Sequence, residues 1–141
     1  MPIQLHQMKT MLATGDMDAT IAFYKGVLGF TLGDKFESSG EISWCEMTLS
    51  DAVLMFTQHE THTDGPKARD HFAQTTIVLY VGNVEAIYED LVDKNVSVSP
   101  LRVTFYGMKE FDLQDPTGYT VLIGQPTTEA PTVEGDGDAP F

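Results

Sequence analysis

The spacing of apolar residues in the first half of the chain changes from strand-like to helix-like and back. Apolar and polar residues alternate over residues 8–14, which predicts a strand. Apolar side chains then recur three or four positions apart, which predicts a helix capped by Asp16 and ended near Gly29. Period-two runs separated by turn residues predict three more strands, over residues 30–36, 42–49 and 52–58.

The same order of elements returns in the second half. Residues 76–81 predict a strand, and residues 83–95 predict a helix with Val84, Ile87 and Leu91 on its apolar side. Three further strands are expected over residues 96–105, 108–114 and 119–124, the last two joined by the turn sequence DPTG.

An offset of 67 residues relates the two halves. It matches Asp16 to Asn83 and Gln58 to Gln125, near the two ends of each half. The sequence therefore predicts an α+β fold of two tandem βαβββ modules, residues 8–58 and 75–125, joined by a linker at 59–74. Each module is too small to cover its own sheet, so we expect the two to pack together as one domain, residues 1–125.

Residues 126–141 have no apolar period and consist mainly of Pro, Gly, Thr and acidic residues. Such a segment buries too little surface to offset its ordering entropy, and it is expected to be a disordered acidic tail.

Composition narrows the range of partners. The chain has 141 residues, with 21 acidic and 8 basic side chains and a formal net charge of -13, so nucleic acid is an unfavourable partner. The acidity serves either solubility in salty surroundings or the attraction of a cationic ligand.

No apolar run reaches the ~20 residues of a membrane span. The lone cysteine, Cys45, and the absence of a secretory leader pattern predict a cytoplasmic location.

Three motifs, in order, resemble the vicinal oxygen chelate superfamily of glyoxalases, extradiol dioxygenases and bleomycin-resistance proteins. They are GDMDATIAFYKGVLGF, SDAVLMF and EFDLQDPTGY, and the resemblance covers residues 8–125. It implies paired βαβββ modules whose curved mixed sheets enclose a cleft, and commonly a homodimer.

Metal-dependent members of that superfamily place a His, Gln or Glu ligand on the first and last strand of each module. By motif, the equivalent residues here are Lys9, Met55, Thr76 and Leu122. None of these side chains is a usual ligand for a hard or borderline cation, so we expect neither a metal nor another cofactor. The linker histidines His62 and His71, with His59, are the weaker alternative for a metal site, because HETH falls one residue short of the HExxH spacing.

Alternate side chains of a strand point to opposite faces. One face of the strand over residues 42–49 therefore carries Trp44, Glu46 and Thr48, and the other carries the apolar Cys45, Met47 and Leu49. Trp44 and Glu46 are therefore expected either to face the cleft, where an aromatic ring beside a carboxylate suits a cation, or to lie on an ordinary sheet face at an interface. The other expected ligand-binding residues are Lys9, Met11, Met55, Thr76, Tyr80, Tyr106 and Leu122, with Phe36 as a further candidate for the aromatic wall.

The segment YGMKEFDLQDPTGY is similar to the bleomycin-resistance group, which lacks the metal and binds a cationic drug. Gln114 and Tyr119 depart from that group's usual Arg and Asn. The side that Glu110 takes is open, because strand polarity turns it inward whereas the 67-residue offset matches Phe111 to Trp44.

The resemblance implies a metal-free protein that sequesters an aromatic or cationic small molecule. The alternative is a metal-independent lyase or isomerase, in which Lys9 polarises a carbonyl and Glu46 or Glu110 moves the proton. A third interpretation is that Lys9 only fills a vacated site and pairs with Glu46.

Overall fold

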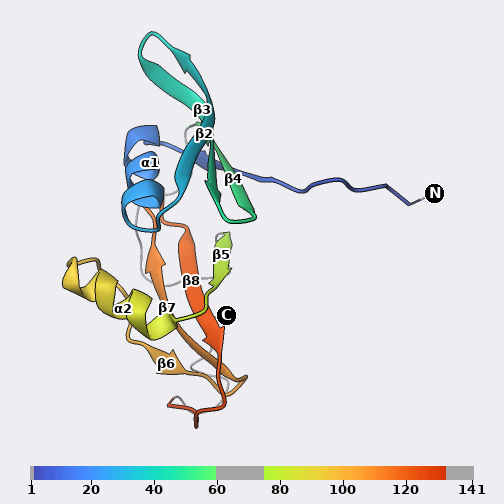
Figure 1. The fold of residues 1–141 in the computed structure, drawn as a ribbon. Helices are drawn as coiled ribbons and strands as arrows, with labels where there is room; N and C mark the ends of the chain where they lie inside the picture. Colours follow the sequence, from blue (N-terminus) through green and yellow to red (C-terminus); the bar gives the residue numbers. More distant parts are fainter. Residues whose placement is uncertain (1, 60–74, 133–141) are drawn as a thin grey trace. The chain divides into compact units, whose positions relative to one another are not determined.

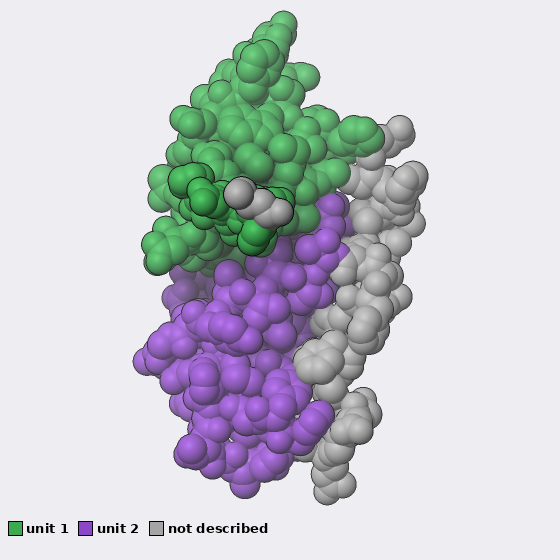
Figure 2. All heavy atoms as spheres, turned by 90° about the vertical axis from the view of Figure 1, so that its right-hand side faces the viewer, with its two compact units in different colours: residues 1–63 green, residues 64–141 purple. Residues whose placement is uncertain are grey.

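The computed structural model describes residues 2–59 and 75–132 of the chain. By its internal contacts the chain divides into two compact units, residues 1–63 and residues 64–141 (Figure 2). Each unit contains one four-stranded mixed sheet and one α-helix, so the α+β class and the two βαβββ modules are confirmed. Neither of the two described helices is long and apolar enough to cross a membrane.

The first unit contains β1 (Thr10–Thr14), α1 (Met17–Gly26), β2 (Thr31–Ser38), β3 (Glu41–Leu49) and β4 (Ala52–Gln58). Its strands lie in the order β1-β4-β3-β2 (Figure 1). The β1 strand is parallel to β4, and the other two pairs are antiparallel.

The second unit repeats this plan with β5 (Thr76–Tyr80), α2 (Val84–Asp93), β6 (Arg102–Val103), β7 (Met108–Gln114) and β8 (Thr120–Pro126). Its strand order is β5-β8-β7-β6, with β5 parallel to β8 (Figure 1). The first and last strands of each module therefore pair in the same way.

Both helices begin with equivalent hydrogen bonds. The side chains of Asp16 and Asn83 accept from the backbone N–H groups of Ala19 and Ala86, at 3.0 and 3.2 Å. Asp16 is the N-cap that the sequence predicts, and Asn83 is its counterpart at the 67-residue offset; both satisfy donors that have no partner within the helix.

One face of the first sheet packs against α1. Tyr24 of α1 is fully buried, and its ring lies 4.8 Å from that of Phe56 in β4. The Cys45 thiol is buried beside Met17, with 3.8 Å between the two sulfur atoms, and this burial raises the pKa of the thiol. Cys45 is thus an inert core residue on the apolar phase of β3, as the alternation predicts.

One face of the second sheet packs against α2 in the same manner. Phe111 of β7 is fully buried, and its ring lies 5.2 Å from that of Tyr88. The core around them is aliphatic and comprises Val84, Leu91, Leu113, Val121 and Ile123.

The 67-residue offset holds for β1, β4, β5 and β8 but becomes 66 residues between β3 and β7. Met55 pairs with Glu46 in the first sheet, whereas Leu122, its counterpart, pairs with Asp112 in the second. The β3–β4 hairpin has an even number of residues between its last paired residues, whereas the β7–β8 hairpin has an odd number. This difference moves β7 by one position relative to β8. Because successive side chains point to opposite faces, Phe111 lies on the helix side and Glu110 on the other.

The predicted strand over residues 96–105 is mostly irregular, and only Arg102–Val103 joins the ladder. Pro100 has no N–H to donate there. The segment after β8 extends the β6 edge of this sheet instead, because the backbone N–H of Thr132 donates to the carbonyl of Val103 at 2.9 Å.

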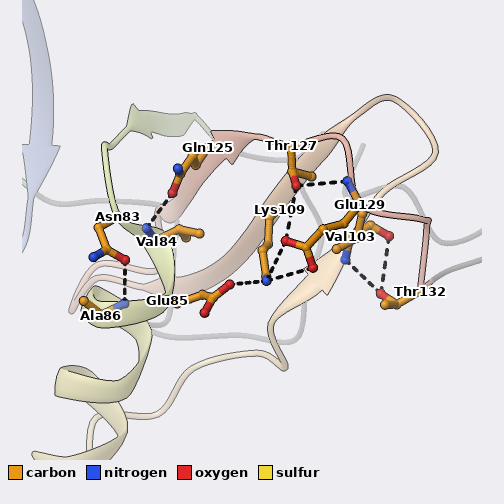
Figure 3. A network of polar contacts seen from close by, with 10 residues as sticks. All are labelled: Asn83, Val84, Glu85, Ala86, Val103, Lys109, Gln125, Thr127, Glu129 and Thr132. Carbon is orange, nitrogen blue, oxygen red and sulfur yellow. Dashed lines mark hydrogen bonds and ion pairs between the residues drawn. The ribbon is translucent and has the colours of Figure 1, made fainter.

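Lys109 also holds this C-terminal segment (Figure 3). Its ammonium forms an ion pair with Glu129 at 3.0 Å and another with Glu85 of α2. Residues 126–132 of the expected tail are thus bonded to the second sheet, and residues 133–141 lie outside the described part.

Candidate functional site

The face of the first sheet that α1 leaves uncovered carries the predicted residues of that module. Met11, Met55 and Glu46 lie in one row across β1, β4 and β3. Trp44 is two positions from Glu46 on the same face, and its neighbour across the ladder is Phe36, whose side chain is 63% exposed. The structure therefore brings aromatic, thioether and carboxylate groups onto one surface.

Lys9 reaches across this surface. It precedes β1, and its ammonium lies 2.5 Å from Oε1 of Glu46 in β3, on the far side of β4. The side chains of Lys9 and Glu46 are 35% and 13% exposed, so the ion pair is partly shielded from water. The interpretation in which Lys9 fills a vacated site and pairs with Glu46 predicts this contact.

The helix-free face of the second sheet carries the other predicted residues. Thr76 and Tyr80 lie on it from β5, Leu122 from β8 and Glu110 from β7, according to the strand register. Tyr80 and Glu110 both pair with Gly124, from opposite sides. Tyr80 is 75% exposed, whereas Leu122 is buried.

Five polar side chains form a cluster there, of which Arg102, Glu110 and Asp112 are buried and Ser99 and Tyr106 half-buried. One Nη of Arg102 lies 3.1 Å from Oδ2 of Asp112 and 3.5 Å from Oε1 of Glu110, and the other donates to Ser99 at 3.1 Å. The phenol of Tyr106 donates to the same Glu110 oxygen. Desolvation, the hydrogen bond to Glu110 and its negative charge raise the pKa of Tyr106, so its hydroxyl remains a donor.

Arg102 is not among the residues predicted from the sequence. It is the single charged residue in the segment from Val96 to Phe105, and that is the signal that could have revealed it. Arg102 pairs with Glu110 at the place where the first sheet pairs Phe36 with Trp44, so an ion pair replaces an aromatic pair.

The four positions equivalent to metal ligands lie on the two helix-free faces and hold Lys9, Met55, Thr76 and Leu122. Within residues 2–59 and 75–132, no group of three or more His, Cys, Asp or Glu side chains could hold a metal ion. His62 and His71 of the alternative linker site lie outside the described residues, and His59 is exposed. The side chains at these four positions do not fit a divalent cation.

An open hollow of about 250 Å³ lies in the first unit where α1 begins. Asp16, Asp18 and Glu41 line it together with Gln58. The carboxylate of Asp16 caps the helix there, and the carboxamide of Gln58 is bonded to the backbone, so the hollow holds residues with structural roles.

A family model matches residues 6–123, with the description Glyoxalase/Bleomycin resistance protein/Dioxygenase superfamily. No curated protein matches the chain significantly in sequence.

Among solved structures, the chain is similar to TnmS3, an antibiotic binding protein from Streptomyces sp. CB03234 (21% identity, TM-score 0.68, covering 90% of this chain and 99% of that one). It is also similar to TioX from Micromonospora sp. ML1 (17%, 0.69, covering 86% and 98%). A third is a lactoylglutathione lyase from Agrobacterium tumefaciens (19%, 0.63, covering 85% and 92%). At these identities the likeness concerns the fold.

Proposed function

Because this chain belongs to the glyoxalase, bleomycin resistance protein and dioxygenase superfamily, we propose that it is a metal-free small-molecule-binding protein of the bleomycin-resistance type. It sequesters an aromatic or cationic compound without changing it. The similarity in fold to an antibiotic binding protein supports this proposal.

The observation that carries the proposal is the helix-free face of the first sheet. Trp44, Met11 and Met55 offer an aromatic ring and two polarisable thioethers on one surface, a composition that favours flat apolar ligands. Met11 is 53% exposed, so this surface is accessible in the single chain.

The ion pair of Lys9 with Glu46 sets the charge preference of this face. A cationic ligand binds Glu46 only by competing with the ammonium of Lys9, which lies 2.5 Å away. An anionic ligand would instead compete with Glu46 for Lys9. Ring stacking on Trp44 therefore supplies most of the affinity on this face, and charge selects among ring systems.

A metal-independent lyase or isomerase is the second candidate. It is favoured by the same contact, which places an ammonium beside a carboxylate on one surface, and by the similarity in fold to a lactoylglutathione lyase. In that case Lys9 would polarise a carbonyl oxygen and Glu46 or Glu110 would transfer the proton.

We also propose that the protein acts as a cytoplasmic homodimer. Ile3, Leu5 and Met8 of the N-terminal segment are 91%, 72% and 76% exposed, and a second copy would remove such apolar surface from water. Light scattering at micromolar concentration tests this, and a monomer would contradict it.

A calorimetric screen of planar cations, neutral aromatic compounds and small oxo-acids tests the function. We expect planar aromatic compounds to bind and to be recovered unchanged by chromatography. Binding of oxo-acids that Lys9→Met abolishes and Glu46→Gln does not, or conversion of any compound, would favour the lyase instead.

A further inference from the structure

We propose that the second sheet carries a cation-recognition site of its own, in which the carboxylate of Glu110 receives an amidinium or ammonium group and Tyr80 provides the aromatic surface. The inference deepens the proposed function, on which it rests for the small-molecule ligand. It moves the negative partner of the ligand from Glu46 to Glu110.

The two oxygens of Glu110 have different surroundings. Oε1 accepts from the phenol of Tyr106 and lies 3.5 Å from the guanidinium of Arg102. Oε2 lies over the backbone of β8 at Gly124, 3.6 Å from where a Cβ on that residue would stand. Among the described residues no hydrogen bond reaches Oε2, so this oxygen can accept one from a ligand.

Gly124 permits this placement. A methyl group there would approach the Cβ of Glu110 to 3.3 Å and the terminal carbon of Met108 to 3.2 Å, closer than ordinary contacts. Without it, the Glu110 side chain lies flat on β8, toward the strand that carries Tyr80.

The chemistry of the unbonded oxygen points to a cation. Glu110 is 2% exposed, and the two polar groups that contact its carboxylate among the described residues, the phenol of Tyr106 and the guanidinium of Arg102, are both at Oε1. A carboxylate oxygen forms its strongest hydrogen bonds with charged donors, so an ammonium or amidinium group is favoured at Oε2 over a neutral donor.

Tyr80 supplies the second contact. It faces Glu110 across Gly124, and its ring is largely exposed. A planar cation can place its charged group at Oε2 and its ring against Tyr80, which combines a charge-assisted hydrogen bond with aromatic contact. The expected ligand class is an aromatic amidinium or a similar flat cation.

The test compares benzamidine with benzamide, a neutral molecule of nearly the same shape, by calorimetry and by NMR of the Gly124 amide. We expect wild-type protein to bind benzamidine at least tenfold more tightly, with a shift of the Gly124 signal. Glu110→Gln keeps an acceptor for Tyr106 and should abolish the preference. Glu89→Gln, which removes one exposed carboxylate from α2, should leave it unchanged and serves as the matched control.

Gly124→Ala is the second variant, because its methyl group crowds the Cβ of Glu110 and so shifts that side chain without changing any charge. It should weaken benzamidine more than benzamide. Equal binding of the two probes by wild type, binding of neither at millimolar concentration, or an unchanged preference in both variants overturns the inference. If planar cations still bind and perturb Trp44 in that event, the proposed function survives and only the assignment to Glu110 fails.

Discussion

Gln58 and Gln125, which stand 67 positions apart, make the same hydrogen bond in the two units. The side-chain oxygen of Gln58 accepts from the backbone N–H of Met17 at 3.0 Å, and that of Gln125 accepts from Val84 at 2.9 Å. Each contact joins the closing strand of a module to the first residue of its helix. Figure 3 shows the second of these contacts.

Replacing either glutamine by alanine should lower the free energy of unfolding by about 1–2 kcal/mol, because a helix N–H loses its acceptor. Gln125→Glu should cost less than Gln125→Ala, since a carboxylate can still accept from the N–H of Val84 and is favoured at a helix N-terminus. Urea denaturation checks both. A loss confined to one of the two alanine variants would contradict equivalent roles.

The sequence predicts most of the strands and both helices, since their periodicity and caps are local properties. The register of β7 is not local, because it depends on the number of residues in the hairpin that follows. For that reason the 67-residue offset misplaces Phe111, whereas strand polarity places Glu110 correctly.

The candidate site is predictable only as two sets of residues, one on each module. Alternation places Trp44 and Glu46 on one face, but it cannot show that Lys9 reaches over β4 to Glu46. Arg102 escapes prediction because residues 96–105 are predicted to form a regular strand, whereas only two of them pair with β7. Long side chains in irregular segments have no periodic pattern to reveal them.

Arg102→Leu should destabilise the protein by about 3–5 kcal/mol, because it removes the guanidinium that contacts two buried carboxylates. Neutralising those carboxylates in the triple variant Arg102→Leu, Glu110→Gln, Asp112→Asn should recover part of the loss. Thermal and urea unfolding measure both changes. A single variant as stable as wild type would show that the cluster is not buried as described.

The contact of Lys109 with Glu129 predicts a pH dependence for the C-terminal segment. The hydrogen bond to Lys109 lowers the pKa of Glu129, so its contribution is present above the ordinary value of 4.5 and is lost as pH falls through the lowered pKa. Hydrogen bonds to Glu85 and Glu129 raise the pKa of Lys109, so its contribution is complete below 10.5 and is lost as pH rises further.

The amide of Thr132 reports on this segment, because it is bonded to Val103. We expect its exchange protection to fall when the solution is acidified below 4.5, after correction for intrinsic exchange rates. Glu129→Gln should show weaker protection already at neutral pH. Protection that is the same in wild type and variant would show that Lys109 does not hold the segment.

Chelators should neither lower the thermal stability nor remove a bound metal, because Lys9, Met55, Thr76 and Leu122 offer no suitable ligands. Elemental analysis of the purified protein checks this. One equivalent of tightly held zinc, nickel, manganese or iron would contradict the prediction.

Fluorescence of Trp44 tests the central claim most directly, since it is the only tryptophan in the chain and lies on the helix-free face of the first sheet. Titration with planar aromatic cations and their neutral analogues should quench or shift this emission saturably, and Trp44→Phe should weaken the same ligands in calorimetry. If no aromatic compound changes the emission, and calorimetry of the wild-type protein detects no binding, the protein is not a binder of aromatic small molecules.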